Sequence, residues 1–180
     1  MKPPAFAYER PTSVEAALAA LARHGEDAKL LAGGTDLVAD LKFSGHSPEV
    51  VIDISRAADL KGIGLTEAGL RIGALVTHNE IMESSVIRDK LPALIEAAAT
   101  IGAVQTRNLG TIGGNLMTCV PSMDSGPALI ALDAEVTVEG PSGRRRMPLS
   151  ELFVGPRKTC LKVDELLVDI VIPKGNLGKP

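Results

Sequence analysis

The sequence is poor in aromatic side chains. It contains one Tyr, three Phe and no Trp among 180 residues. A core therefore has to be built mainly from Leu, Ile, Val and Ala, and the sequence lacks the aromatic stacking platforms on which single-stranded nucleic acids are usually bound. The net charge of −3 also gives no reason to expect a polyanionic partner. We therefore do not expect nucleic acid to be a ligand.

Cysteine, histidine and long apolar runs are also scarce. The two cysteines, Cys119 and Cys160, and the three histidines show no spacing typical of a metal site or a disulfide framework. We expect two reduced thiols and no metal bound by the protein. No apolar run reaches the roughly 20 residues that cross a bilayer, and the N-terminus lacks the apolar segment of a secretion signal. The sequence thus predicts a cytoplasmic chain without a membrane span.

The remaining composition is that of a globular protein, with 45% apolar and 23% charged residues. One basic run, Arg144 to Arg146, follows a Pro-Ser-Gly turn. Such a run can be a binding patch or the solvated tip of a hairpin, and we favour the hairpin tip.

Apolar periodicity and capping residues predict alternating helices and strands. Thr12 with Glu15, and Thr77 with Glu80, match the capping box that opens a helix. His78 directly follows Thr77, and we favour a structural role for it at the helix start over catalysis. We expect helices over residues 12–23, 37–43, 77–84, 91–102 and 128–134, strands over 29–32, 49–54, 135–140 and 165–173, and a hairpin that turns at 67–69.

Two pairs of adjacent glycines stand in similar surroundings. The first lies in "LLAGGTDL", residues 30–37, and the second in "RNLGTIGGNLMT", residues 107–118. Each pair alone can be a tight turn that needs positive φ. Alternatively, the missing Cβ atoms let consecutive backbone N–H groups point at a phosphate. Neither stretch matches the dinucleotide fingerprint G-x-G-x-x-G or the P-loop, so the residues indicate a two-loop cradle for an anion or a dinucleotide.

A resemblance to a known family gives the two loops a common role. In order along the chain, "LLAGGTDL", "QTRNLGTIGGNL", "PSMDSGPALIALDAEV" and "GPRKT…DELLVDIVIP" resemble the FAD-binding medium subunit of molybdenum hydroxylases. This family includes relatives of xanthine dehydrogenase, aldehyde oxidoreductase and carbon monoxide dehydrogenase. The similarity runs from about Phe6 to Pro173, nearly the whole chain.

The resemblance implies an α+β fold, a two-lobed FAD-binding domain of the vanillyl-alcohol oxidase type. We expect an N-terminal lobe over residues 1–56 with the first FAD loop, a second lobe over 57–175 with the second loop, and a tail over 176–180. Family members usually continue into a further C-terminal domain, which we expect this chain to lack. The flavin would then be more exposed and more weakly held.

The resemblance also implies a set of FAD-binding residues. The first segment that would hold the pyrophosphate is Ala32, Gly33, Gly34, Thr35 and Asp36, and the second is Thr111, Ile112, Gly113, Gly114 and Asn115. Thr118 and Asp124 match polar residues near the ribityl chain and the isoalloxazine ring, while Ile101 and Leu167 match apolar contacts of the ring. We expect no catalytic residue and no metal ligand.

In this family, electrons from a molybdopterin large subunit pass through the iron–sulfur clusters of a small subunit to FAD and then to an external acceptor. The resemblance therefore implies an electron-transfer subunit of an oxidoreductase complex with both partners. One alternative is a stand-alone FAD oxidoreductase, for which Thr118, Cys119 and Asp124 are the candidate proton donors. Another is a non-catalytic assembly module, although intact glycine pairs disfavour it.

Overall fold

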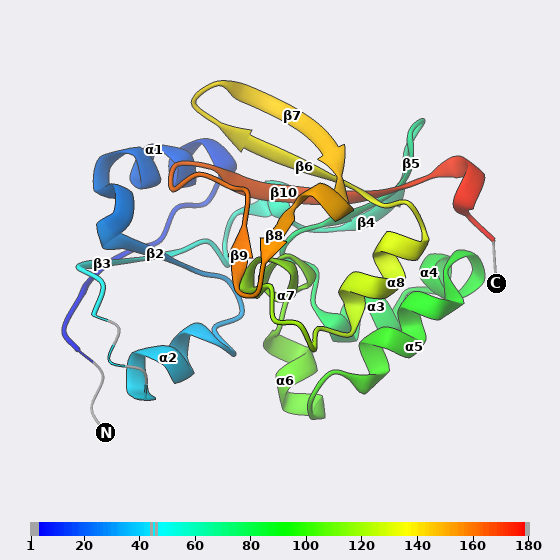
Figure 1. Ribbon diagram of the computed structural model, residues 1–180, viewed down its shortest axis with the longest axis horizontal. Coiled ribbons are helices and arrows are strands. Elements are labelled where there is room, and N and C mark those ends of the chain that lie inside the picture. The colour runs from blue at the N-terminus through cyan, green and yellow to red at the C-terminus, as the bar shows by residue number, and fades with distance from the viewer. Residues whose placement is uncertain (1–3, 44, 46, 179–180) are drawn as a thin grey trace.

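The computed structural model describes residues 4–43, 45 and 47–178. Strands form one small parallel sheet and one larger antiparallel sheet, and most helices lie along one face of the larger sheet (Figure 1). The predicted lobe boundaries at residues 56 and 175 stay a prediction, and residues 1–3, 44, 46, 179 and 180 of the predicted parts lie outside the described residues.

The small sheet is parallel, with the order β1-β3-β2. Its central strand is buried along its whole length, as expected for the apolar run of residues 50–52, and Asp53 at its end is buried too. Leu30 of β2 pairs with Ile52 of β3, so the chain leaves both strands at the same edge of the sheet. The three strands are β1 (Ala7–Glu9), β2 (Ala28–Leu31) and β3 (Val50–Asp53).

Helix α1 (Val14–His24) connects β1 to β2 and covers this sheet. Its apolar face is buried at Val14, Ala17 and Leu21, and Gly25 ends the helix with φ 53°. The predicted capping box of Thr12 and Glu15 is wrong. The side chain of Ser13 accepts the hydrogen bond of the Ala16 amide at 3.1 Å instead, because Ser13 is the last extended residue before the helix.

The larger sheet is antiparallel, with the order β4-β5-β10-β6-β7. The hairpin predicted at residues 67–69 joins β4 to β5, and the strand predicted over 135–140 is β6. The five strands are β4 (Ile63–Leu65), β5 (Gly69–Gly73), β6 (Glu135–Gly140), β7 (Gly143–Pro148) and β10 (Leu166–Pro173).

Strand β10 lies at the centre of the larger sheet and joins the two cores. Leu166 and Val168 pack with α1 and β3, whereas Leu167, Ile170 and Ile172 belong to the core under the helices. A register shift between Leu167 and Asp169 accompanies this change of side. Asp169 alone interrupts the apolar run of residues 166–172, and the strand is buried over this range because both of its faces are covered.

Six helices cover one face of the larger sheet. The capping box of Thr77 and Glu80 is confirmed, since the Thr77 side chain accepts from the Glu80 amide at 3.1 Å and the Thr77 amide donates to Glu80 at 2.7 Å. Pro92 stands in the first turn of its helix, where its missing N–H is tolerated. The helices are α3 (His78–Glu83), α4 (Ser85–Lys90), α5 (Pro92–Thr100), α6 (Val104–Leu109), α7 (Ile112–Thr118) and α8 (Ser125–Ala131).

Three of these helices, α4, α6 and α7, were not predicted. Glycine disfavours helix interiors, so the second glycine pair was interpreted as a loop. In the structure Gly113 and Gly114 stand in the first turn of α7, where Thr111 caps the helix. A short hairpin, β8 (Phe153–Gly155) with β9 (Lys158–Thr159), lies beside the end of α7, where the Arg157 amide donates to the carbonyl oxygen of Cys119 at 2.7 Å (Figure 1).

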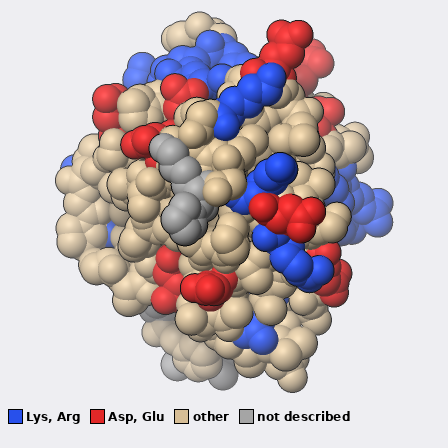
Figure 2. Space-filling view, turned by 90° about the vertical axis from the view of Figure 1, so that its right-hand side faces the viewer, with Lys and Arg blue, Asp and Glu red and all other residues tan. Residues whose placement is uncertain are grey.

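The basic run is exposed and belongs to the β6–β7 hairpin, where it begins directly after the turn and not at the tip itself. Arg144, Arg145 and Arg146 lie along β7, and each faces a carboxylate of a neighbouring segment, at 2.6 Å, 2.5 Å and 3.6 Å. Their carboxylate partners are Glu139, Glu165 and Glu135. Acidic and basic side chains are likewise intermixed on the face shown in Figure 2.

Candidate functional site

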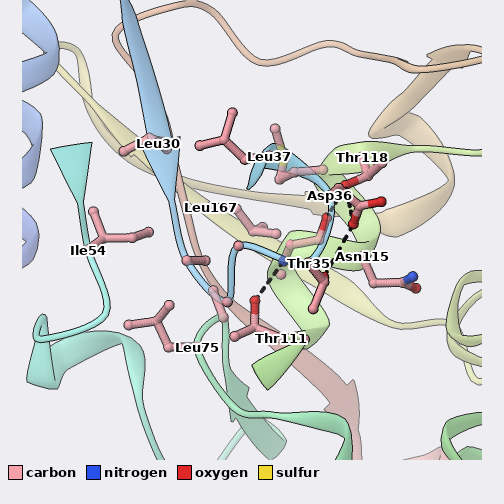
Figure 3. A pocket seen from close by; sticks show the side chains of 18 of the residues that line it. Leu30, Thr35, Asp36, Leu37, Ile54, Leu75, Thr111, Asn115, Thr118 and Leu167 are labelled. Carbon is pink, nitrogen blue, oxygen red and sulfur yellow. Dashed lines mark hydrogen bonds between the residues drawn. The ribbon is translucent and has the colours of Figure 1, made fainter. Parts of the chain in front are cut away.

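A cavity of about 690 Å³ opens between the turn after β2, the start of α7 and strand β10. Its size falls within the range of cofactor sites. Apolar side chains, among them Leu30, Ile54 and Leu75, lie on one side of the cavity in Figure 3, and polar ones lie on the other. Twelve of the predicted residues line it: Ala32, Gly33, Gly34, Thr35, Asp36, Ile101, Thr111, Gly113, Gly114, Asn115, Thr118 and Leu167.

The first glycine pair forms an irregular turn between β2 and α2 (Leu37–Phe43). Gly34 has φ +76°, which only glycine adopts readily. A Cβ added to Gly33 would lie 1.8 Å from the carbonyl oxygen of Leu109. The backbone of this turn is therefore in close contact with the backbone before α7. A side chain at residue 33 would therefore push the two walls of the cavity apart.

The turn leaves a run of backbone donors free. No described residue accepts a hydrogen bond from the amides of Gly33, Gly34, Thr35 and Asp36. Unpaired N–H groups at a solvent-accessible turn can bind an anion, because each donates a charge-assisted hydrogen bond. The first segment therefore has the donors that a phosphate group needs.

The second glycine pair lines the cavity as well, and its predicted contact with FAD stays a prediction. The Gly113 amide donates to the carbonyl oxygen of Ala74 at 2.9 Å, and the Gly114 amide donates to Oγ1 of Thr111 at 3.1 Å. These two donors are thus used inside the protein. A Cβ on Gly113 would lie 2.7 Å from the carbonyl oxygen of Ala74, so this glycine instead allows α7 to pack against the turn after β5.

Polar side chains connect the two segments across the cavity. The hydroxyl of Thr118, at the end of α7, donates to the Gly114 carbonyl at 2.9 Å and lies 3.5 Å from the carboxylate of Asp36. Figure 3 shows Asp36, Thr118 and Asn115 on this polar side. Asn115 accepts a hydrogen bond from the buried Ser125 at 2.6 Å, which fixes its side chain.

Two predicted residues do not line the cavity. Ile112 is fully buried in the core beneath α7, because the side chain at the first position of that helix points into the protein. Asp124 precedes α8 and influences the cavity through its charge, which acts on His78.

His78 lines the cavity, although the sequence indicated only a structural role for it. Its side chain is buried, with 2% of the residue exposed. Burial lowers the pKa of His78, the positive charge of Arg107 adds to this effect and Asp124 opposes it, and together they bring the pKa to about 4. The imidazole is therefore neutral at pH 7.

Other lining residues carry no sequence signal that reveals them. They follow strands or helices from distant parts of the chain, and only the fold brings them together. Among the described residues, no group of His, Cys, Asp and Glu is suited to hold a metal ion, and no helix is long and apolar enough to cross a membrane. These further lining residues are Lys29, Leu30, Leu37, Asp40, Ile54, Ala74, Leu75, Thr106, Gly110, Met117, Arg157, Leu161, Glu165 and Leu166.

Comparison with known proteins identifies the ligand that this cavity fits. The family described as "FAD binding domain in molybdopterin dehydrogenase" matches residues 4–175. The chain belongs to this family of FAD-binding domains. It is similar to the carbon monoxide dehydrogenase medium chain of Hydrogenophaga pseudoflava, with 41% identity over 173 residues that make up 96% of this chain and 60% of the relative. The xanthine dehydrogenase FAD-binding subunit of Escherichia coli O157:H7 is 38% identical over 167 residues, 92% of this chain and 57% of the relative.

Solved structures agree with this assignment. Carbon monoxide dehydrogenase from H. pseudoflava superimposes with a TM-score of 0.94 and 41% identity, over 97% of this chain and 61% of that one. Quinoline 2-oxidoreductase from Pseudomonas putida 86 gives a TM-score of 0.92 at 29% identity, with the same coverage of both chains. The predicted α+β FAD-binding fold is thereby confirmed. The chain spans about 60% of the length of these relatives.

The groups that line the cavity suit the two chemical parts of FAD, its diphosphate and its rings. FAD joins two flat ring systems through a diphosphate, and the cavity offers unpaired amides at residues 33–36 beside apolar walls. The amides suit the anionic diphosphate and the apolar walls suit the rings.

Proposed function

We propose that this chain holds FAD in the cavity and serves as the electron-transfer unit of a molybdenum hydroxylase complex. The unpaired amides of Gly33, Gly34, Thr35 and Asp36 support this proposal most strongly, because they offer an anion site at the edge of a cofactor-sized cavity. The relatives are themselves named as medium chains or FAD-binding subunits of dehydrogenases.

Different residues of the cavity would bind different parts of FAD. We propose that the turn at residues 32–36 receives the diphosphate, that Thr118 and Asn115 meet hydroxyl groups of the cofactor, and that Ile101 and Leu167 pack against a ring. Thr111, Gly113 and Gly114 hold α7 in place, and Ile112 supports it from the core. Asp124 acts through its charge from the start of α8.

Bound FAD would accept electrons and release them to an external acceptor, and the protein would bind, orient and tune it. We further propose a cytoplasmic location and two partners, a small subunit with iron–sulfur clusters and a large subunit with molybdopterin. The names of the relatives, such as "medium chain" and "FAD-subunit", support a multisubunit setting. No acid or base of the chain needs to take part in the chemistry.

A stand-alone oxidoreductase would need a proton donor beside the flavin, and the structure disfavours two of the three candidates. Cys119 is buried outside the cavity, and its thiol donates to the carbonyl oxygens of Gly155 and Lys158 at 3.3 Å and 3.6 Å. Asp124 does not line the cavity either. Thr118 does, but its hydroxyl donates to a backbone carbonyl.

Titration of the purified chain with FAD tests the site. We expect the fluorescence of FAD to be quenched when it binds. We also expect the protein to keep its bound FAD, and therefore its yellow colour, after desalting. Gly33→Val should abolish binding, because a side chain at this position collides with the Leu109 backbone at the edge of the unpaired amides. Gly64→Val is the matched control, since its Cβ meets nothing within 4 Å and Gly64 lies in β4 outside the cavity.

The outcomes separate the possibilities. Binding by the wild type and by Gly64→Val but not by Gly33→Val supports the proposal. Full binding by Gly33→Val would mean that FAD does not lie on this turn. A wild-type chain that takes up no FAD would contradict the proposal as a whole.

A further inference from the structure

His78 is a buried polar residue whose ring has no partner in the protein. The ring atom Nδ1 is enclosed and makes no hydrogen bond, and no hydrogen bond of Nε2 is found among the described residues. Buried polar groups are nearly always paired, so an unpaired imidazole at the wall of a ligand cavity requires an explanation. The partner of Nε2 is expected to come from the ligand, whereas Nδ1 stays enclosed by the protein.

The protein fixes the position of this ring through the backbone. The His78 amide donates to the carbonyl oxygen of Gly110 at 3.1 Å, and the capping box of Thr77 and Glu80 secures the start of α3. A bridge between Thr77 and Thr111 ties the same point to the start of α7. The imidazole is thus anchored between two segments that line the cavity.

One edge of the ring is directed toward the cavity. Nδ1 is shut off from solvent, whereas Cδ2, which is bonded to Nε2, faces Gly110 and would lie 3.4 Å from a Cβ at that residue. Gly110 itself lines the cavity and lies beside Gly33 of the turn with the unpaired amides. The Nε2 edge is therefore the side of the ring that a ligand can reach.

The burial of Nδ1 also indicates the tautomer. A buried N–H without an acceptor is rarer and costlier than a buried lone pair without a donor. The proton of the neutral ring is therefore expected on Nε2, which makes this atom a hydrogen-bond donor.

We propose that His78 contacts FAD, with its neutral imidazole donating a hydrogen bond from Nε2 to an oxygen of the cofactor. This inference rests on the proposed FAD site and adds a binding residue that lies in neither glycine-pair segment. Because the ring is neutral, the contact is a hydrogen bond and not an ion pair, so its effect on affinity should depend little on salt.

Two substitutions of similar size distinguish a contact to FAD from a purely structural role. His78→Leu removes the donor and keeps the bulk, whereas His78→Gln places an amide N–H at a reach similar to that of Nε2. The measurements are the dissociation constant for FAD, from fluorescence quenching, and the melting temperature of the FAD-free chain. His24→Leu is the control. His24 lies in α1 outside the cavity, and its Nε2 is hydrogen-bonded to the Glu9 carboxylate at 2.6 Å.

We expect His78→Leu to weaken FAD binding about 5- to 15-fold, which is the effect of losing one neutral hydrogen bond and leaving its acceptor on FAD unpaired. His78→Gln should stay within about 3-fold of the wild type on the same basis, and His24→Leu should bind FAD normally. The FAD-free His78→Leu chain should melt no lower than the wild type, because the substitution removes an unpaired buried polar group.

The contrary results are equally distinct. If the wild type binds FAD and His78→Leu binds it equally well, the contact does not exist, although the FAD site stands. If His78→Leu lowers the melting temperature of the FAD-free chain and His78→Gln does not rescue FAD binding, the histidine is a structural residue. A wild type that binds no FAD overturns both the site and this contact.

Discussion

The backbone of Gly33 lies against the carbonyl oxygen of Leu109, so closely that a Cβ on the glycine would approach that oxygen to 1.8 Å. This contact joins two segments that are far apart in the sequence, the turn after β2 and the end of α6. It sets the distance between the walls of the FAD cavity, and its geometry can be tested by small substitutions.

Gly33→Ala adds the smallest side chain to this contact. Because the backbone of residue 109 cannot rotate away as a side chain could, we expect the free energy of unfolding to fall by about 1–3 kcal/mol. FAD affinity should fall by at least about 10-fold, since the turn must move to relieve the collision. Urea unfolding and FAD titration measure the two effects, and Gly64→Ala is the control. An unchanged affinity in Gly33→Ala would show that the turn can shift without disturbing the site.

Thr111 caps α7 and so keeps the Gly114 amide engaged. Thr111→Val preserves the shape of the side chain but removes the acceptor, and we expect a loss of about 1 kcal/mol in the free energy of unfolding. Thr111→Ser keeps the hydroxyl and should lose less. Chemical denaturation of the three proteins tests this order, and equal stability of the valine and wild-type chains would mean that the cap contributes nothing.

The stability of the FAD-free chain should depend on the protonation of His78. Burial lowers the pKa of this histidine from 6.5 to about 4, so the unfolded chain binds a proton more readily than the native one. Stability should therefore fall as the pH drops from about 6.5 to about 4, by on the order of 3 kcal/mol from this residue.

The difference between the wild type and His78→Gln isolates this effect. The variant lacks the titrating ring, so its curve of unfolding free energy against pH should be flatter across the same interval. Lowered carboxyl pKa values, such as that of Glu165 hydrogen-bonded by Arg145, act on both chains alike and cancel. Parallel curves would show that His78 is not held neutral by burial.

Cys119→Ser should leave FAD binding within about 2-fold of the wild type, because Cys119 is buried outside the cavity and its replacement removes no contact with FAD. A serine hydroxyl can donate to the carbonyl of Gly155 as the thiol does, and Cys119 does not line the cavity. Absorbance of the desalted protein after FAD addition gives the occupancy. A large loss of flavin would indicate that this thiol supports the site more directly than its contacts suggest.

Local sequence signals predicted the elements whose formation depends on neighbouring residues. The range 37–43 was predicted as a helix and is α2, and the capping box of Thr77 and Glu80 opens α3. Both are determined over a few residues by periodicity and by side chains that cap the backbone. The prediction failed for α7, because the helix propensity of Gly113 and Gly114 is poor and tertiary contacts with Ala74 outweigh it.

The sequence by itself identified the family, the glycine pairs and twelve of the residues that line the cavity, because these are properties of short segments in a fixed order. Only the tertiary structure decided what each glycine pair does. The amides of the first pair have no partner in the described chain, while those of the second are bonded to Ala74 and Thr111. The tertiary structure also decided the position of His78. Its unpaired ring lies at the cavity wall because the bridge between Thr77 and Thr111 joins the starts of α3 and α7. A hydrogen-bond partner can lie anywhere along the chain, so whether a donor is free depends on the packing of distant segments and not on the residues beside it.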